Sequence, residues 1–163
     1  PDLTVLQLDA HSDMRSEYHG SSCNHACIMA RAKEVAQVVQ VGIRSSDRAE
    51  FENIVPERIF YAHQIKQSSD WIDRVCARLG KKVYLTIDLD FFDPAYLPAT
   101  GTPEPDGLAY ADAIALVKRV CEQAQIVGMD IVELCPHPAH RASDFFAAKL
   151  LYQLLSIVFA KRT

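Results

Sequence analysis

TVLQLDAHSD, residues 4–13, joins a short apolar run to a cluster of ionisable side chains, and it decides the fold that we expect. The run TVLQLD (4–9) has the length and composition of a buried strand. It ends in Asp9, and His11 and Asp13 follow at every second position. In α/β sheets, ligands collect outside the carboxyl ends of the strands, so this segment predicts a strand that leads into a binding site.

The rest of the chain alternates short β-rich runs with longer amphipathic stretches. We expect further strands at residues 38–43, 58–63, 82–90 and 126–134. We expect helices at residues 24–36, 46–54, 68–80, 110–124 and 143–160. Because the alternation is regular and several strands are apolar on both faces, the sequence predicts an α/β fold, a three-layer α/β/α arrangement around a mainly parallel sheet. The Pro- and Gly-rich stretch 93–107 is expected to be a loop.

The overall composition excludes several classes of partner. The chain has 163 residues, which fits one domain (1–163), and its formal net charge of -4 argues against nucleic acid or anionic membrane as a partner. No run approaches 18 uninterrupted apolar residues, so we expect no transmembrane helix, and we see no signal-peptide pattern. The five cysteines form no CxxC pair, which favours reduced thiols in the cytoplasm.

A second acidic segment follows another predicted strand. KVYLTIDLD (82–90) ends in Asp88 and Asp90, and alternate residues of a strand point to the same side. If the two strands are neighbours, their carboxylates and the His11 imidazole meet at one spot. Adjacent carboxylates cannot all ionise without a compensating charge, and oxygen ligands with one imidazole suit Mn²⁺. The competing interpretation is that a strand-end Asp caps a helix or forms a turn, as we expect for Asp93 before Pro94.

Four motifs together resemble those of the ureohydrolases, the arginase and agmatinase family: DAHSD (9–13), DLDFFDP (88–94), TGTPEP (100–105) and GMDIVELCP (128–136). The segments EYHGSSCNHACIMARA (17–32) and VGIRS (41–45) are most similar to agmatinase-like members. The resemblance implies an arginase-like fold, two Mn²⁺ ions, and hydrolysis of agmatine to putrescine and urea by a hydroxide that bridges the metals. Arginase, guanidinobutyrase and formiminoglutamase activities of the same family stay open as alternatives.

The resemblance also implies the roles of individual residues. Asp9 and Asp88 resemble the carboxylates that bridge the two metals. Asp13 resembles a ligand of the first metal that is also catalytic, because it accepts a hydrogen bond from the bridging hydroxide. His11 and Asp90 resemble ligands of the second metal.

Two further residues resemble parts of the catalytic apparatus. His25 resembles the histidine that passes a proton toward the leaving amine, and Glu133 resembles the carboxylate that pairs with the substrate guanidinium. Outside the family, His25 reads as a histidine that packs locally at a helix start, and Glu133 as a solvated loop residue.

The family's upstream metal-binding histidine has no counterpart among the six histidines of this sequence. We therefore expect a C-terminal portion of a ureohydrolase domain, with the N-terminal part of the fold missing, that binds the first metal weakly and is poorly active. An exposed sheet edge is expected to favour self-association. The alternative is a catalytically silent metal-binding or assembly module. The resemblance further implies a small guanidino substrate and a homo-oligomer, a trimer or hexamer.

Overall fold

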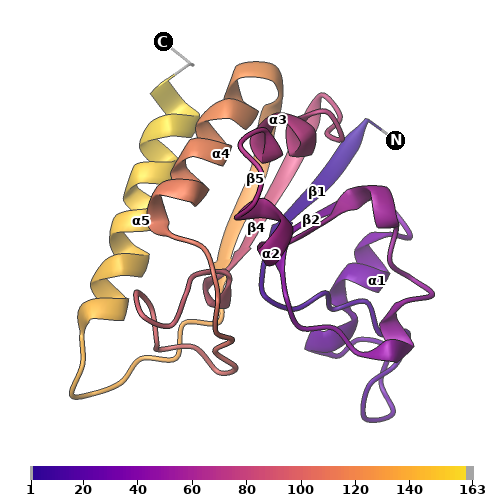
Figure 1. Cartoon of the computed structure of the whole chain (residues 1–163), viewed down its shortest axis with the longest axis horizontal. Coiled ribbons are helices and arrows are strands. Elements are labelled where there is room, and N and C mark those ends of the chain that lie inside the picture. The colour runs from indigo at the N-terminus through magenta and orange to yellow at the C-terminus, as the bar shows by residue number, and fades with distance from the viewer. Residues whose placement is uncertain (1, 161–163) are drawn as a thin grey trace.

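A single parallel sheet forms the centre of the molecule (Figure 1). The computed structural model describes residues 2–160, and within them the sheet has five strands in the order β3-β2-β1-β4-β5. The strands are β1 (Leu3–Leu8), β2 (Gln37–Ile43), β3 (Ile59–Tyr61), β4 (Lys82–Asp88) and β5 (Gln125–Val132). All four pairings are parallel, so the predicted α/β fold with a mainly parallel sheet is confirmed.

The two central strands bring both acidic segments to the same level. Leu8 lies opposite Ile87 in the register of β1 and β4, so the chain leaves both strands side by side. Beside them, β2 bends at Gly42, whose φ of 93° lies in the region that favours glycine. A Cβ atom there would lie 2.5 Å from the Phe91 ring, so only glycine lets β2 approach the segment that follows β4.

The helices cover the two faces of the sheet unequally (Figure 1). The hydrophobic core on one face includes residues from α2 (Ala62–Ile65), α3 (Trp71–Cys76), α4 (Tyr110–Gln123) and α5 (Ala142–Ala160). The opposite face carries α1 (Ile28–Ala32), which packs in a small second cluster with Met14 and Val38. The three layers are therefore present, but the second helical layer lies over the β1–β2 side.

Several predicted elements are shorter than expected because polar side chains turn the backbone. The predicted helix 24–36 is a 3-10 turn at His25–Cys27 followed by α1, and the predicted helix 46–54 is reduced to a 3-10 turn at Arg48–Glu50. The carboxylate of Asp47 accepts from the amide of Ala49 and starts that turn.

The boundaries of other elements differ from the predicted ones by a few residues. The strand expected at 58–63 ends at Tyr61, where α2 begins, and the helix expected at 68–80 is α3 alone. The strand expected at 82–90 ends at Asp88, and a further 3-10 turn covers Leu89–Phe91.

The C-terminal helix α5 is unusually apolar. By length and composition alone it is able to cross a membrane, which the uninterrupted-run criterion did not anticipate. In the fold, Ala147, Leu150 and Leu154 are buried in the hydrophobic core, whereas Phe145, Tyr152 and Phe159 of the same helix are exposed. Only 22% of the apolar stretch of α5 is buried.

Candidate functional site

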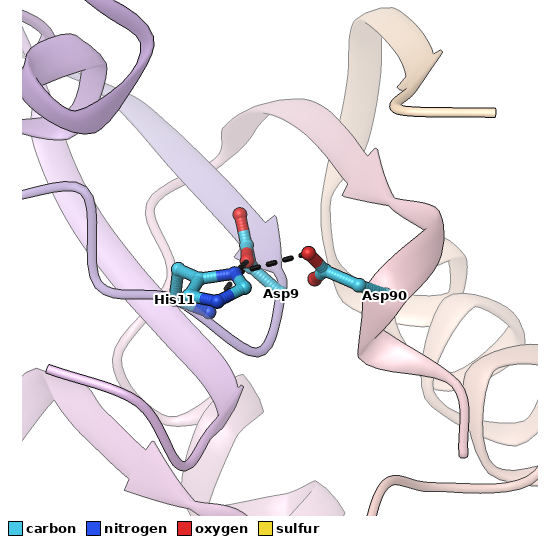
Figure 2. Close-up of side chains that lie close together, drawn as sticks. All are labelled: Asp9, His11 and Asp90. Carbon is cyan, nitrogen blue, oxygen red and sulfur yellow. Dashed lines mark hydrogen bonds and ion pairs between the residues drawn. The ribbon is translucent and has the colours of Figure 1, made fainter. Parts of the chain in front are cut away.

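Three side chains converge at the carboxyl ends of β1 and β4. Nδ1 of His11 lies 3.0 Å from Oδ2 of Asp90 and 3.6 Å from Oδ1 of Asp9 (Figure 2). One ligand atom from each of the three residues lies within 4.8 Å of the others. Two carboxylates and one imidazole in this arrangement are suitable ligands for a divalent cation such as Mn²⁺.

The surrounding backbone and side chains hold the two carboxylates of this cluster in place. Asp9 accepts hydrogen bonds from Nε2 of Gln7 at 2.7 Å and from the amide of His11 at 2.6 Å. Asp90 accepts from the amide of Ala10 at 3.0 Å, which joins the segment after β1 to the segment after β4. Asp9 and Asp90 are almost completely buried, so their geometry is set by the fold rather than by solvent.

Strand alternation does not bring Asp88 and Asp90 together, so this part of the sequence prediction is wrong. We expected both residues on one extended strand, but β4 ends at Asp88 and Asp90 lies in the following 3-10 turn. The carboxylate of Asp88 accepts from the amide of Asp90 at 2.9 Å and starts this turn. Likewise His11 lies beyond the end of β1. The cluster is built by turns at the strand ends, not by strand alternation.

The remaining predicted site residues line a cavity beside the cluster. Its volume is about 550 Å³, and its walls include Asp13, His25, Asp88 and Glu133 together with His11 and Asp90. Asp13 and Glu133 have φ angles of 52° and 63°, which non-glycine residues seldom adopt. Backbone strain of this kind concentrates at functional sites, so it supports a role for both residues.

Asp13 and His25 line the cavity from two segments that a backbone hydrogen bond holds together. The carbonyl of Asp13 accepts from the amide of Met29 at 3.1 Å, so the segment after β1 is fastened to the first turn of α1. His25 lies in the 3-10 turn that precedes this helix, is exposed, and has its ring 6.0 Å from that of Tyr18. A solvent-accessible imidazole at the wall of the cavity is suited to exchange protons with a bound molecule.

Burial and mutual repulsion shift the protonation of the acidic residues. Burial, reinforced by neighbouring carboxylates, raises the pKa of Asp88 to about 10 and that of Asp13 to about 8. Burial also raises the pKa of Asp9 to about 6.

The pKa of the His11 imidazole shifts in the direction opposite to the one that burial favours. Burial alone would lower the pKa of His11, but hydrogen bonds to Asp9 and Asp90 raise it to about 11. The site therefore contains more buried negative charge than a single imidazolium balances, and a divalent cation would supply the difference.

Sequence reasoning missed a charged group on the far wall of the cavity. Arg15 lies 3.1 Å from Oδ2 of Asp47 and 3.3 Å from Oε1 of Glu50, and Glu50 is buried. All three residues line the cavity. Their segment, 46–54, was interpreted only as a short helix. Its Asp and Glu three residues apart were the available signal.

Comparison with known proteins gives consistent matches. Residues 1–156 match the arginase family. The N(1)-aminopropylagmatine ureohydrolase of Synechocystis sp. is 38% identical over 157 residues, which are 94% of this chain and 51% of that protein. The agmatinase of Pyrococcus horikoshii is 33% identical over 164 residues, which are 96% of this chain and 58% of that protein. This chain thus spans about half the length of the curated relatives it matches.

Solved structures agree with the sequence matches. The agmatine ureohydrolase of Thermoplasma volcanium superposes with a TM-score of 0.86 at 37% sequence identity, over 99% of this chain and 57% of that one. The arginase of Bacillus subtilis has a TM-score of 0.80 at 23% identity, a likeness of fold alone.

Proposed function

This chain belongs to the arginase family, and on that premise we propose that it hydrolyses the guanidinium group of agmatine to putrescine and urea with two Mn²⁺ ions. The observation that carries the proposal is the convergence of Asp9, His11 and Asp90 beside a cavity that Asp88 and Glu133 also line. Bound Mn²⁺ would supply Lewis acidity and a strong nucleophile from water near neutral pH.

The acidic residues divide between the two proposed metal positions. Asp9, which follows β1, and Asp88, the last residue of β4, would each contribute to both metal positions, since the two strands are neighbours and end at the same level. His11 and Asp90 would complete the second position, and Asp13 would contribute to the first. Because Asp13 and Asp88 have raised pKa values, their carboxyl groups would release protons when cations bind.

Two residues of the cavity would act on the substrate itself. Glu133 would pair with the planar guanidinium, because a carboxylate accepts two parallel hydrogen bonds from such a group. The side chain of His25 would pass a proton to the leaving amine, which its exposed position at the cavity wall permits. The positive φ of Glu133 would hold its carboxylate at the end of β5.

The charges of the cavity favour a cationic substrate without a carboxylate. Among the described lining residues, Asp13, Asp88 and Asp90 are assigned to the metals, Glu133 is left to meet a cationic group, and one Arg side chain is present. That residue, Arg15, is already paired with Asp47 and Glu50. A substrate carboxylate, as in arginine, would therefore meet no free cation there. Agmatine fits this balance, and so does N(1)-aminopropylagmatine, the substrate in the name of the Synechocystis relative.

The test is manganese stoichiometry after dialysis together with urea release from agmatine, N(1)-aminopropylagmatine and arginine. We expect bound Mn²⁺ and urea from the two amine substrates, and loss of both metal and urea in Asp88→Ala. The matched control is Asp130→Asn, because Asp130 lies on β5 and does not line the cavity. Its carboxylate accepts hydrogen bonds from the hydroxyl groups of Tyr84 and Thr86.

Two outcomes would contradict the proposal in different ways. Metal binding without urea from any of the three substrates would favour the alternative of a catalytically silent metal-binding or assembly module. A protein that binds no Mn²⁺ under any condition would exclude the metal centre itself.

The proposal extends to assembly and location. We propose a homo-oligomer, a trimer or hexamer, which sedimentation velocity would measure directly. We also propose a cytoplasmic location, since the five cysteines of the sequence form neither a CxxC pair nor a disulfide framework, as expected in a reducing compartment.

A further inference from the structure

The imidazole of His11 has a third carboxylate beside its other nitrogen. While Nδ1 faces Asp9 and Asp90, Nε2 lies 3.7 Å from Oε1 of Glu104. Glu104 comes from the loop after β4, its side chain is 35% exposed, and its carboxylate lies within ion-pair distance of the ring. The ring is thus placed between three acidic groups, Asp9 and Asp90 at Nδ1 and Glu104 at Nε2.

One guanidinium fixes the backbone on both sides of this ring. Nη2 of Arg44 donates to the carbonyl of Asp90 at 2.6 Å and to the carbonyl of Glu104 at 2.9 Å. Nε of the same residue donates to the carbonyl of Pro105 at 2.9 Å. Because these bonds are made by a rigid planar fork, the spacing between Asp90 and Glu104 is set by a single side chain at the end of β2.

The loop has a separate anchor at its surface. Lys66, which follows α2, forms an ion pair with Asp106 and donates to its carbonyl. This pair ties the loop to the α2 side of the molecule without touching His11. The carboxylate of Glu104 takes no part in this anchor and lies beside Nε2 of His11 instead.

We propose that Glu104, set by Arg44, is a positioning residue that pairs with the protonated Nε2 of His11 and thereby presents Nδ1 to the metal. A histidine that ligates a metal through one nitrogen commonly donates its other N–H to a carboxylate, which fixes the tautomer and the ring orientation. The assignment rests on the proposed metal centre, which supplies the ligand for Nδ1. It adds a specific role for the TGTPEP loop.

Mn²⁺ affinity of the variants tests this role. Loss of an outer carboxylate of this kind weakens metal binding by roughly 10- to 100-fold, and we expect that loss for Glu104→Ala. Glu104→Gln keeps an oxygen acceptor and should restore part of the affinity. The matched control is Asp106→Asn, which breaks the loop's surface ion pair and should leave affinity within about twofold. Glu104→Ala with wild-type affinity would overturn the proposal.

A metal-free measurement separates this inference from the proposed function. In the metal-free protein, the Nε2 proton of His11 should give a slowly exchanging low-field NMR signal in wild type and in Glu104→Gln. That signal should be lost to exchange in Glu104→Ala. If wild type binds no Mn²⁺, the proposed function fails and this spectrum alone decides the role of Glu104. An identical signal in wild type and Glu104→Ala would overturn it.

Discussion

The two faces of the sheet differ in what their buried side chains do. On the face of α4 and α5, Leu6, Leu8, Leu85 and Ile87 are all fully buried and apolar. On the opposite face, β1 and β2 carry the buried glutamines Gln7 and Gln40 beside a small apolar cluster that includes Val38. The same strands therefore carry most of the hydrophobic core on one side and a buried polar network on the other, because successive side chains point to opposite faces.

The polar face leads directly into the candidate site. Nε2 of Gln40 donates to Oε1 of Gln7 and to the carbonyl of Ser12, each at 2.6 Å. Gln7 in turn donates to Asp9. A buried network of this kind is stable only when its members are satisfied, and here it also orients a proposed metal ligand. The comparison teaches that stability and site geometry are separated across one sheet.

The β4–β5 part of the polar face is open. Tyr84, Val127 and Val132 are 36%, 47% and 42% exposed, and β5 is an edge strand of the described sheet. This region combines exposed apolar side chains with an unpaired strand edge, the combination that invites association. Four predictions use the contrast between the faces, in order of decreasing effect.

The largest effect is expected on the apolar face. Leu85→Ala removes a fully buried side chain from the core and should lower the free energy of unfolding by about 2–5 kcal/mol, because it leaves a cavity. Urea unfolding of metal-free protein measures this loss. A loss below about 1 kcal/mol would show that this face is not the main source of stability.

The next effect is a pH dependence that arises on the polar side. The folded-state pKa values of Asp13, Asp88 and His11 are raised to about 8, about 10 and about 11, so the folded chain binds more protons than the unfolded chain. Stability of the metal-free protein should therefore fall as the pH rises from about 5 to about 9, by about 1.4 kcal/mol per pH unit for each proton that the folded chain binds and the unfolded chain does not.

The variant Asp88→Asn and added Mn²⁺ both test the origin of this slope. The substitution removes one titrating group and should flatten the pH dependence measured by thermal unfolding. Added Mn²⁺ should reverse it, because cations bind the deprotonated carboxylates. A stability that rises with pH without metal would contradict the origin assigned here.

A moderate effect is expected within the polar network. Gln40→Leu leaves Gln7 and the Ser12 carbonyl without a donor and should lower stability by about 1–3 kcal/mol. It should also weaken Mn²⁺ binding, since Gln7 holds Asp9. The control Gln64→Leu, at an exposed position of α2, should change neither quantity. Unaltered metal affinity in Gln40→Leu would separate the network from the site.

The smallest effect is expected on the open part of the polar face. Val127→Thr keeps a β-branched side chain at a position that is 47% exposed, so the free energy of unfolding should change by less than about 0.5 kcal/mol. Chemical denaturation at two protein concentrations measures it. A larger loss that grows with protein concentration would mean that this face is covered in an assembly.

Much of the architecture was predictable from local sequence. The alternation of apolar runs with amphipathic stretches located β1, β4 and α4 to within a few residues, because burial and helical periodicity leave a direct trace in the sequence. The same trace placed Asp9 and Asp88 at the ends of two predicted strands. The turn at Leu89–Phe91 was missed, since it depends on one hydrogen bond from Asp90 to the Asp88 carboxylate.

The sequence by itself determined the strand and helix order and the chemical identity of the acidic, imidazole-containing site. Only the tertiary structure decided that β1 lies beside β4, that Arg44 spans from β2 to Asp90 and Glu104, and that Glu104 faces His11. The physical reason is distance along the chain. Periodicity reports on neighbours a few residues apart, whereas these contacts join residues more than forty positions apart and form when the sheet assembles.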